Sequence, residues 1–518
     1  MENKRSKDTV HQRGLRISKP HAEELVNFYN AHVQSEAFHA GDLLRINYAH
    51  VLMLYEQKVL PRQEAHHILK SLHHLEKEGV GKAIAVDPRI GDLSTHMEAY
   101  VIGKTGEETG GKIHTGRSRN DLYTTLTKMF LRQSLLDIYD TLLTLEGSLL
   151  LLTFEHIETV MPGYTHHSQP AQPITFGHYI LGNFDVFSRD LKRIEDFWPR
   201  LNTCPMGAAA MATTGFPLNR QRIAELLGFN GIHEHSYDAV SAKDFLLEYL
   251  FILAIISSDL GRLAENLLYW NTAVYGMISL ADEYTSFSTI MPQKKNPVAV
   301  ETLRAFNSII SGKLFNAFGI LKAEPWSNGR EMIILDDDSL DTGKQVQNMI
   351  LLLNGMLKTM EVRKDRMREL SGQGFSTATE LADTLSREYH FSFRTAHEVV
   401  GLLVKRAVES GIEAGQILPE MVEECIQQCL GKNFSVNPEI VRKALDPREN
   451  VRIRSLPGGP AFEEVTRMAK NREKILSGMK AFLSDRRSRL AEAYQDLNKK
   501  VEEMIQYKPP STGQGFQV

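Results

Sequence analysis

The sequence is poor in cysteine and in long uncharged apolar runs. Its three cysteines, Cys204, Cys425 and Cys429, are too few and too poorly flanked for a disulfide framework or a zinc site. The most apolar run, 245–257, carries Glu248 and is too short to span a bilayer. The N-terminal stretch is polar and lacks the apolar core of a secretory signal. We therefore expect a cytoplasmic protein with no membrane partner, no metal and no cofactor.

Net charge is also small. Lys and Arg total 60 against 64 Asp and Glu, a formal net charge of -4. Such a balance provides no overall basic field to attract nucleic acid, so no nucleic-acid partner is expected. The length of 518 residues exceeds that of a single-core domain and indicates two or three domains or one long helical body.

Helical patterns dominate what is present. Long runs without internal proline, rich in Leu, Ile, Ala and Glu, cover 138–157, 174–197, 242–270 and 298–321. Residues 245–256 are apolar on nearly every face, so a helix there must be covered all round. The pattern predicts a bundle whose core extends across subunits, and hence a homo-oligomer.

The first of three breaks between these runs is "GGKIHTGRSRND", residues 110–121. A helix that starts here offers free amide groups and the positive end of its dipole to a carboxylate. Arg119 could grip that carboxylate with two hydrogen bonds, and Ser118 and Asn120 would add neutral donors. The alternative is a capped, salt-bridged loop, because Ser-x-x-Asp is also a common helix-capping pattern.

The second break, "MPGYTHHSQPAQP", places His166 and His167 side by side between a turn and a proline-rich stretch. A lone histidine is usually structural. Two histidines beside Thr165, with a further hydroxyl at Ser168, favour acid–base work or substrate contact.

The third break, "SFSTIMPQKKNPVAVE", spans residues 286–301. It brings together Ser288, Thr289, Lys294 and Asn296, which are a possible proton acceptor, a second hydroxyl, a cation and an amide donor. A solvated charge run would explain the lysines but not the prolines that bracket Met-Pro-Gln-Lys-Lys-Asn-Pro. The pattern therefore indicates a functional loop.

Together the three segments resemble the signature regions of the fumarase/aspartase superfamily, and most closely its argininosuccinate lyase branch. The segments "KTGEETGGKIHTGRSRND", "MPGYTH", "DAVSAKDFLLEYL", "IMPQKKNP" and "GFSTATELAD" follow the order and spacing of that branch. The resemblance covers about residue 12 to about residue 470. It implies an all-α subunit of three domains, 1–117, 118–370 and 371–518, with a long central helical bundle. It also implies a homotetramer in which each active site combines the three segments from three subunits.

The chemistry that the resemblance implies is reversible β-elimination of fumarate from argininosuccinate or another N-substituted aspartate, with fumarate and an amine as small-molecule partners. Loss of a weakly acidic proton beside a carboxylate creates a dianionic aci-carboxylate, which Arg119, Lys294 and Asn296 would stabilise. By similarity, Ser288 would be the general base, on a mobile loop that closes over the substrate. Glu301 would orient and charge the histidine of the second segment.

The remaining substrate-binding roles are also implied by similarity. The two carboxylates of the succinyl half would be held by Ser118, Asn120, Thr165 and Thr289. The functional histidine is His166 if the alignment is anchored on "PGYTH" and His167 if it is anchored on "QPAQP", because one extra residue separates the two motifs. We favour His166.

Several positions depart from the family pattern. Phe287 stands where glycine is usual and Thr289 where serine is usual, while Val298 and Leu122 replace polar residues expected near the amine half of the substrate. The usual arginine-contacting residues are not recognisable, and that region instead contains Trp326, Arg330 and Glu331. We therefore expect weak activity on argininosuccinate and better activity on another adduct. The alternative is a non-catalytic, crystallin-like member of the family.

Overall fold

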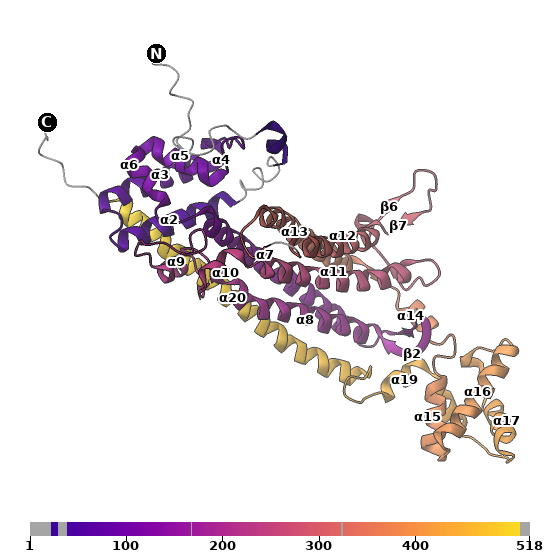
Figure 1. The fold of residues 1–518 in the computed structure, drawn as a ribbon. Helices are drawn as coiled ribbons and strands as arrows, with labels where there is room; N and C mark the ends of the chain where they lie inside the picture. The colour runs from indigo at the N-terminus through magenta and orange to yellow at the C-terminus, as the bar shows by residue number, and fades with distance from the viewer. Residues whose placement is uncertain (1–21, 29–38, 167, 323–324, 508–518) are drawn as a thin grey trace, which may run out of the picture.

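The computed structural model describes residues 22–28, 39–166, 168–322 and 325–507. The described chain is elongated and consists mainly of helices, with a helical group at each end of a central bundle (Figure 1). The predicted all-α fold is confirmed.

The N-terminal helices pack around a core of their own. Leu43, Ile46, Leu69 and Leu72 are among its fully buried side chains. Asp92 precedes the third of the longer helices, and its carboxylate accepts the Thr95 main-chain N–H at 2.8 Å. The helices of this group are α2 (Ala40–Glu56), α3 (Arg62–Glu78), α4 (Val80–Ala83), α5 (Leu93–Thr105), α6 (Glu107–Gly110) and the 3-10 helix η3 (Gly111–His114).

Five long helices form the central bundle. They are α7 (Arg119–Glu155), α8 (Phe176–Leu201), α11 (Asp244–Asn271), α12 (Val298–Leu321) and α13 (Arg330–Thr359). The expected run 298–321 has the bounds of α12, and the runs for α8 and α11 agree with their helices to within a few residues. Most of the run 138–157 lies within α7, which begins at Arg119 in the break where a helix start was expected.

Short elements connect the long helices. The hairpin of β1 (Val160–Thr165) and β2 (Gln169–Thr175) joins α7 to α8, and a hairpin of β6 (Ser286–Phe287) and β7 (Lys295–Asn296) lies between α11 and α12. The other connecting elements are β3 (Thr203–Cys204), α9 (Arg220–Leu226), β4 (Gly231–Ile232), α10 (Ser236–Ser241), β5 (Ile278–Ser279), η4 (Asp282–Tyr284) and β8 (Glu361–Val362).

A small helical group with a separate core follows the bundle. Leu385, Leu403 and Ile426 are buried at its centre. Its elements are α15 (Ala378–Tyr389), α16 (Phe393–Glu409), η5 (Ala414–Gln416), α17 (Pro419–Leu430) and α18 (Pro438–Leu445), flanked by α14 (Lys364–Ser371) and α19 (Pro447–Ile453).

The last described helix, α20 (Phe462–Ile505), runs back along the bundle to the N-terminal group (Figure 1). It is 44 residues long. A leucine recurs every seven residues and is buried at Leu476, Leu483, Leu490 and Leu497. This spacing gives α20 one continuous apolar seam, which packs mainly on α7.

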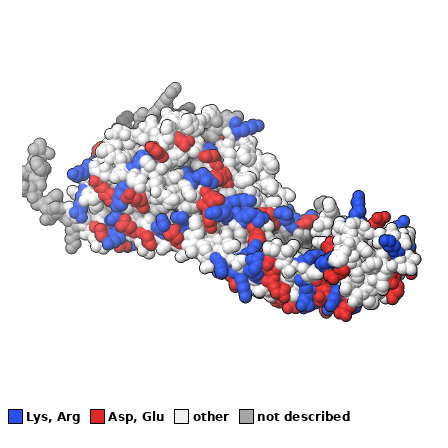
Figure 2. Space-filling model, turned by 90° about the horizontal axis from the view of Figure 1, so that it is seen from below, with Lys and Arg blue, Asp and Glu red and all other residues white. Residues whose placement is uncertain are grey.

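One face of the bundle leaves apolar side chains uncovered in the single chain. Phe251 on α11, Phe315 on α12 and Leu351 on α13 are all at least half exposed. The run 245–256 is therefore not buried on every side within one chain. Elsewhere, acidic and basic side chains alternate over the surface, as Figure 2 shows for one face. Within the described ranges, no helix is long and apolar enough to cross a membrane.

Candidate active site

The first segment forms the start of α7. Ser118 is its N-cap, and its Oγ accepts the Asn120 main-chain N–H at 3.3 Å. In return, the Ser118 main-chain N–H donates to Asp121 Oδ1 at 2.9 Å. This capping box satisfies main-chain donors that the first helical turn leaves unpaired. The capped-loop interpretation is therefore correct for Ser118, whose hydroxyl hydrogen remains available to donate.

Arg119 follows the cap and lies at the surface. Its Nη1 pairs with Asp92 Oδ2 at 3.1 Å. Burial alone would raise the pKa of Asp92, but Arg119 and the two hydrogen bonds from Thr95 hold that pKa below its usual range. A substrate carboxylate that binds Arg119 would thus meet a guanidinium already positioned by an ionised Asp92.

Asp121 is a positioning residue that the sequence reasoning missed. Besides the cap, its Oδ2 accepts the main-chain N–H groups of Gly207 and Ala209, each at 2.9 Å. Asn120 donates from Nδ2 to the Ala210 carbonyl at 3.0 Å. The helix start and the loop 205–215 are thus held together, and the Ser-x-x-Asp spacing was the signal available for Asp121.

The second segment forms the tip of the β1–β2 hairpin. Thr165 pairs with Gln169, and His166 and Ser168 lie beyond this last pair at the tip. His166 has φ of 45° and Ser168 φ of 72°, and both Thr165 and His166 are exposed. His167 lies outside the described residues, and the choice between the two histidines stays a prediction.

The third segment forms the β6–β7 hairpin. Ser286 pairs with Asn296, and Lys295 ties the hairpin to Asp282 with an N–O distance of 2.7 Å. At the tip, Ser288 Oγ accepts main-chain N–H groups from Met291 at 3.1 Å and from Ile290 at 3.4 Å. Two amides directed at one oxygen favour negative charge on it, which is what a serine base requires.

The other residues of this segment are largely exposed in the single chain. Lys294 and Thr289 lie on the hairpin surface, Asn296 is half-buried, and Glu301 projects from the first turn of α12. Phe287 and Ile290 are 82% and 84% exposed, an unusual degree for large apolar side chains. The hairpin therefore presents both polar and apolar groups outward.

One chain does not bring the three segments together. At 1.5 Å per residue, the 37 residues of α7 extend over about 55 Å. Arg119 begins this helix, whereas the β1–β2 hairpin follows its far end. The β6–β7 hairpin follows α11 and projects from the bundle on the side away from α5 and α6 (Figure 1).

Leu122, which replaces a polar residue expected near the amine half of the substrate, occupies a core position. Its side chain is 0% exposed and belongs to the core of the N-terminal helices. Position 122 is one turn into α7 and faces inward, so an apolar residue there reflects packing. Val298, the first residue of α12, remains partly exposed.

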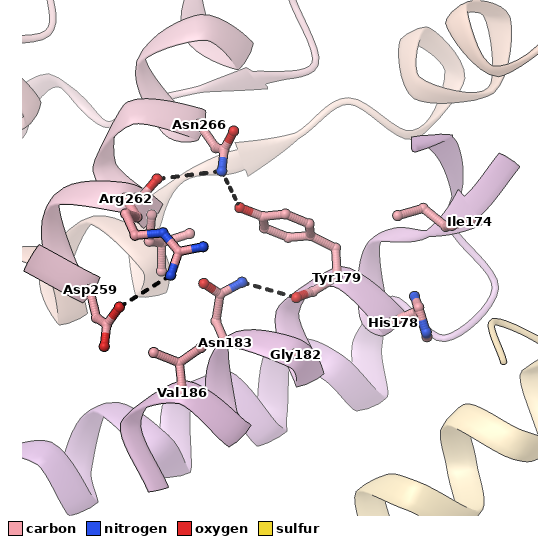
Figure 3. A pocket seen from close by; sticks show the side chains of 10 residues that line it. Ile174, His178, Tyr179, Gly182, Asn183, Val186, Asp259, Arg262 and Asn266 are labelled. Atoms are coloured by element: carbon pink, nitrogen blue, oxygen red, sulfur yellow. Dashed lines mark hydrogen bonds and ion pairs between the residues drawn. The ribbon is translucent and has the colours of Figure 1, made fainter. Parts of the chain in front are cut away.

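A separate pocket of about 370 Å³ lies between α8 and α11 (Figure 3). It contains none of the predicted catalytic or substrate-binding residues. Its polar groups bond largely to one another: Asn266 donates to the Tyr179 hydroxyl at 2.7 Å, and Arg262 pairs with Asp259 at 3.4 Å. Burial raises the pKa of Tyr179 to about 12. The three exposed segments remain the candidate site.

Comparison with known proteins decides the family. Residues 25–312 match the lyase family model, and residues 375–452 match the argininosuccinate lyase C-terminal model. The chain is 40% identical over 474 residues to argininosuccinate lyase of Methanocaldococcus jannaschii, and the aligned region covers 91% of this chain and 94% of the relative. The chain belongs to the argininosuccinate lyase branch of the fumarase/aspartase superfamily. It is a carbon–nitrogen lyase of this branch, and the non-catalytic alternative is not favoured.

Other members of the superfamily agree with this assignment. Argininosuccinate lyase 1 of Shouchella clausii is 37% identical, with 93% of this chain and 97% of the relative covered. The crystal structure of EDDS lyase in complex with formate has a TM-score of 0.83 at 32% identity and covers 94% of this chain and 96% of its own. Class II fumarase from Schistosoma mansoni shares the fold alone, with a TM-score of 0.68 at 15% identity, covering 82% of this chain and 94% of its own.

Proposed function

We propose that the protein releases fumarate from argininosuccinate by β-elimination, in a site built from the three segments of different chains. Ser288 Oγ removes the proton from the carbon beside the distal carboxylate of the substrate. The electron pair forms the aci-carboxylate, then expels the nitrogen and leaves the double bond of fumarate. The departing amine takes a proton. The single observation that carries this proposal is the pair of amides directed at Ser288 Oγ.

The cations and amide donors act on the charge that develops. Arg119, Lys294 and Asn296 stabilise the aci-carboxylate, because charge–dipole interactions strengthen where water is excluded. The histidine of the second segment contacts the substrate or moves a proton, and Glu301 charges and orients it. The carboxylates of the succinyl half are held by Ser118, Asn120, Thr165 and Thr289.

The assembly is proposed as a homotetramer. Two features support it: α7 extends over about 55 Å from Arg119 to Glu155, and the β1–β2 hairpin with His166 follows its far end, and the bundle leaves Phe251 and Phe315 uncovered. Burying such apolar faces between copies is the usual solution for a helical bundle. We further propose three domains, 1–117, 118–370 and 371–518, and a cytoplasmic location.

We favour argininosuccinate over other adducts as the substrate because the relatives named above are argininosuccinate lyases. The expectation of weak activity on it depended on Leu122, on Val298 and on the missing arginine-contacting residues, and of these Leu122 is a core residue. A second candidate, another N-substituted aspartate, is favoured by the apolar Val298 and by the likeness to EDDS lyase, of which a variant has been solved with bound fumarate.

Steady-state kinetics separates the two candidates. Fumarate absorbance is followed with argininosuccinate and with a panel of other N-substituted aspartates. We expect kcat/KM on argininosuccinate above about 10⁴ per molar per second, within the ordinary enzyme range. A value at least about a hundredfold lower than for another adduct would make that adduct the substrate. No fumarate from any of them would refute the proposed activity.

A further inference from the structure

Three aromatic side chains lie together beside the first segment. The Trp326 and His235 rings are stacked, with centroids 6.3 Å apart and an interplanar angle of 19°, and the Tyr237 ring lies 5.0 Å from Trp326 at 38°. Trp326 is 61% exposed and His235 is exposed, whereas Tyr237 is partly buried. We call these three residues the aromatic platform.

Hydrogen bonds between side chains and nearby main-chain groups hold the platform in place. The Asp238 main-chain N–H donates to His235 Nδ1 at 3.3 Å, which fixes the ring at the start of α10. On the other side, Asn328 Nδ2 donates to the Val240 carbonyl at 3.0 Å and anchors the segment that carries Trp326. The rings therefore belong to two segments that are bonded to each other.

Hydrogen bonds connect the platform with the substrate-binding end of α7. The Arg220 guanidinium donates to the Glu234 carbonyl at 3.0 Å and to the Met206 carbonyl at 3.3 Å. The loop after Met206 is the one that Asp121 and Asn120 hold. In addition, Thr127 of α7 donates to Asp336 at 2.8 Å, ten residues after Trp326. The platform and Arg119 thus lie at the same end of the bundle.

The chemistry of the platform suits a planar cation. An aromatic face attracts a cation through its quadrupole, most strongly for Trp, and guanidinium stacks on such a face with little loss of hydration. The carboxylate of Glu234 lies next to His235 in the sequence and is exposed, which adds negative charge nearby. A neutral or anionic group would gain less from the same surface.

We propose that the aromatic platform binds the guanidinium of the amine half of the substrate and sets the preference for arginine. This inference rests on the proposed function, because it takes the succinyl half to be bound by Ser118, Arg119 and Asn120. The scissile bond joins a guanidino nitrogen to the succinyl half, so the platform holds the face of the group that leaves. Loss of the platform therefore raises KM for arginine, and it lowers kcat to the extent that the platform also positions the departing nitrogen.

The reverse reaction provides the sharpest test, because arginine and fumarate are then separate ligands. In the intact oligomer, Trp326→Ala should raise KM for arginine about 3- to 30-fold, with KM for fumarate within about twofold. Trp326→Phe keeps an aromatic face and should change KM for arginine less than about threefold. Phe393→Ala removes an exposed aromatic ring from α16 in the C-terminal group and serves as the matched control.

A second readout measures binding rather than a rate. The chain has three tryptophans, and Trp198 and Trp270 are buried, so quenching of fluorescence by acrylamide reports chiefly on Trp326. Arginine together with fumarate should reduce that quenching in the wild type. The change should disappear in Trp326→Phe, which retains both buried tryptophans.

Three outcomes are distinguishable. A selective rise in KM for arginine, together with protection of Trp326, supports the platform. If the wild type cleaves argininosuccinate but Trp326→Ala leaves KM for arginine unchanged, or raises both KM values equally, the platform inference is overturned while the proposed function stands. If the wild type yields no fumarate from argininosuccinate, the proposed substrate falls, and the platform inference with it.

Discussion

At the tip of the β6–β7 hairpin, Ser288 combines a reactive position with little structural duty. Its Oγ accepts two amides within the hairpin and contacts no buried core. Ser288→Ala should therefore leave a folded oligomer and lower turnover at least about a hundredfold, as loss of a general base does. Ser286→Ala, on the same hairpin, should keep turnover within a few-fold. A Ser288→Ala enzyme with more than about a tenth of wild-type turnover would exclude Ser288 as the base.

Glu146 is a residue whose charge state affects stability. It lies on α7, fully buried, and its Oε1 accepts from Ser188 at 2.7 Å. Burial, helped by the nearby charges of Asp185 and Asp190, raises the pKa of Glu146 from 4.5 to about 8. A raised carboxyl pKa contributes stability that is fully present below 4.5 and is lost as the pH rises through about 8.

Glu146→Gln should remove this dependence. We expect the variant to exceed the wild type in free energy of unfolding at pH 9 by on the order of a few kcal/mol, and to match it more closely at pH 6. Denaturant unfolding at the two pH values measures the difference. Glu155→Gln, an exposed position on the same helix, is the control. An equal stability difference at both pH values would contradict the buried, protonated state of Glu146.

At the scale of elements, α20 connects the bundle with the N-terminal helices. Leu476, Leu483 and Leu490 belong to the core of the bundle, whereas Leu497 belongs to the N-terminal core. One helix therefore contributes to both cores, and its seam couples their stability.

Leu483→Ala tests this coupling. Truncating a buried leucine costs about 2–5 kcal/mol through lost burial and a residual cavity. We expect a loss of that size in denaturant unfolding, with kcat unchanged at low temperature because α20 contributes none of the proposed catalytic groups. Ser484→Ala, an exposed neighbour, should be neutral within about 0.5 kcal/mol. A neutral Leu483→Ala would show that the seam does not stabilise the bundle.

Some elements were predictable from the sequence, and others were not, for physical reasons. The limits of α12 followed from Pro297 and the proline-free run after it. Residues 119–137 of α7 lay outside the expected long runs because threonines have low helix propensity, yet Thr124 and Thr125 are buried and bond to the carbonyls four residues earlier. The seven-residue leucine repeat of α20 stands in the sequence, but the many charged residues between the leucines hide it. Tertiary packing decided both cases.

The site residues were predictable as segments but not as a geometry. The motifs located Ser288 and Arg119, whereas nothing in their spacing showed that Asp121 would anchor the neighbouring loop. The sequence also did not show that Leu122 faces the core, since that depends on the rotation of α7. Contacts between distant segments, such as Trp326 with His235, arise only in the folded chain.

In the whole molecule, the proposed active site requires residues from more than one copy of the chain. Figure 1 shows the β6–β7 hairpin projecting from the bundle. In the single chain, the bundle also leaves large apolar side chains exposed. A site complete in one chain would need Arg119 and His166 to meet, but Arg119 begins α7 and His166 follows its far end, which lies about 55 Å along the helix. The enzyme is therefore expected to lose activity on dissociation even where the single chain stays folded.

Mixing two inactive variants tests this claim most directly. Arg119→Ala and Ser288→Ala each remove one essential group, and each should be inactive alone. If the two groups of one site come from different chains, unfolding and refolding an equal mixture should restore about a quarter of wild-type activity on argininosuccinate, because a quarter of the sites draw both groups from intact segments. Mass spectrometry confirms that mixed oligomers have formed. Mixed oligomers with no activity above that of the separate variants would show that each chain builds its own site, and would contradict the account.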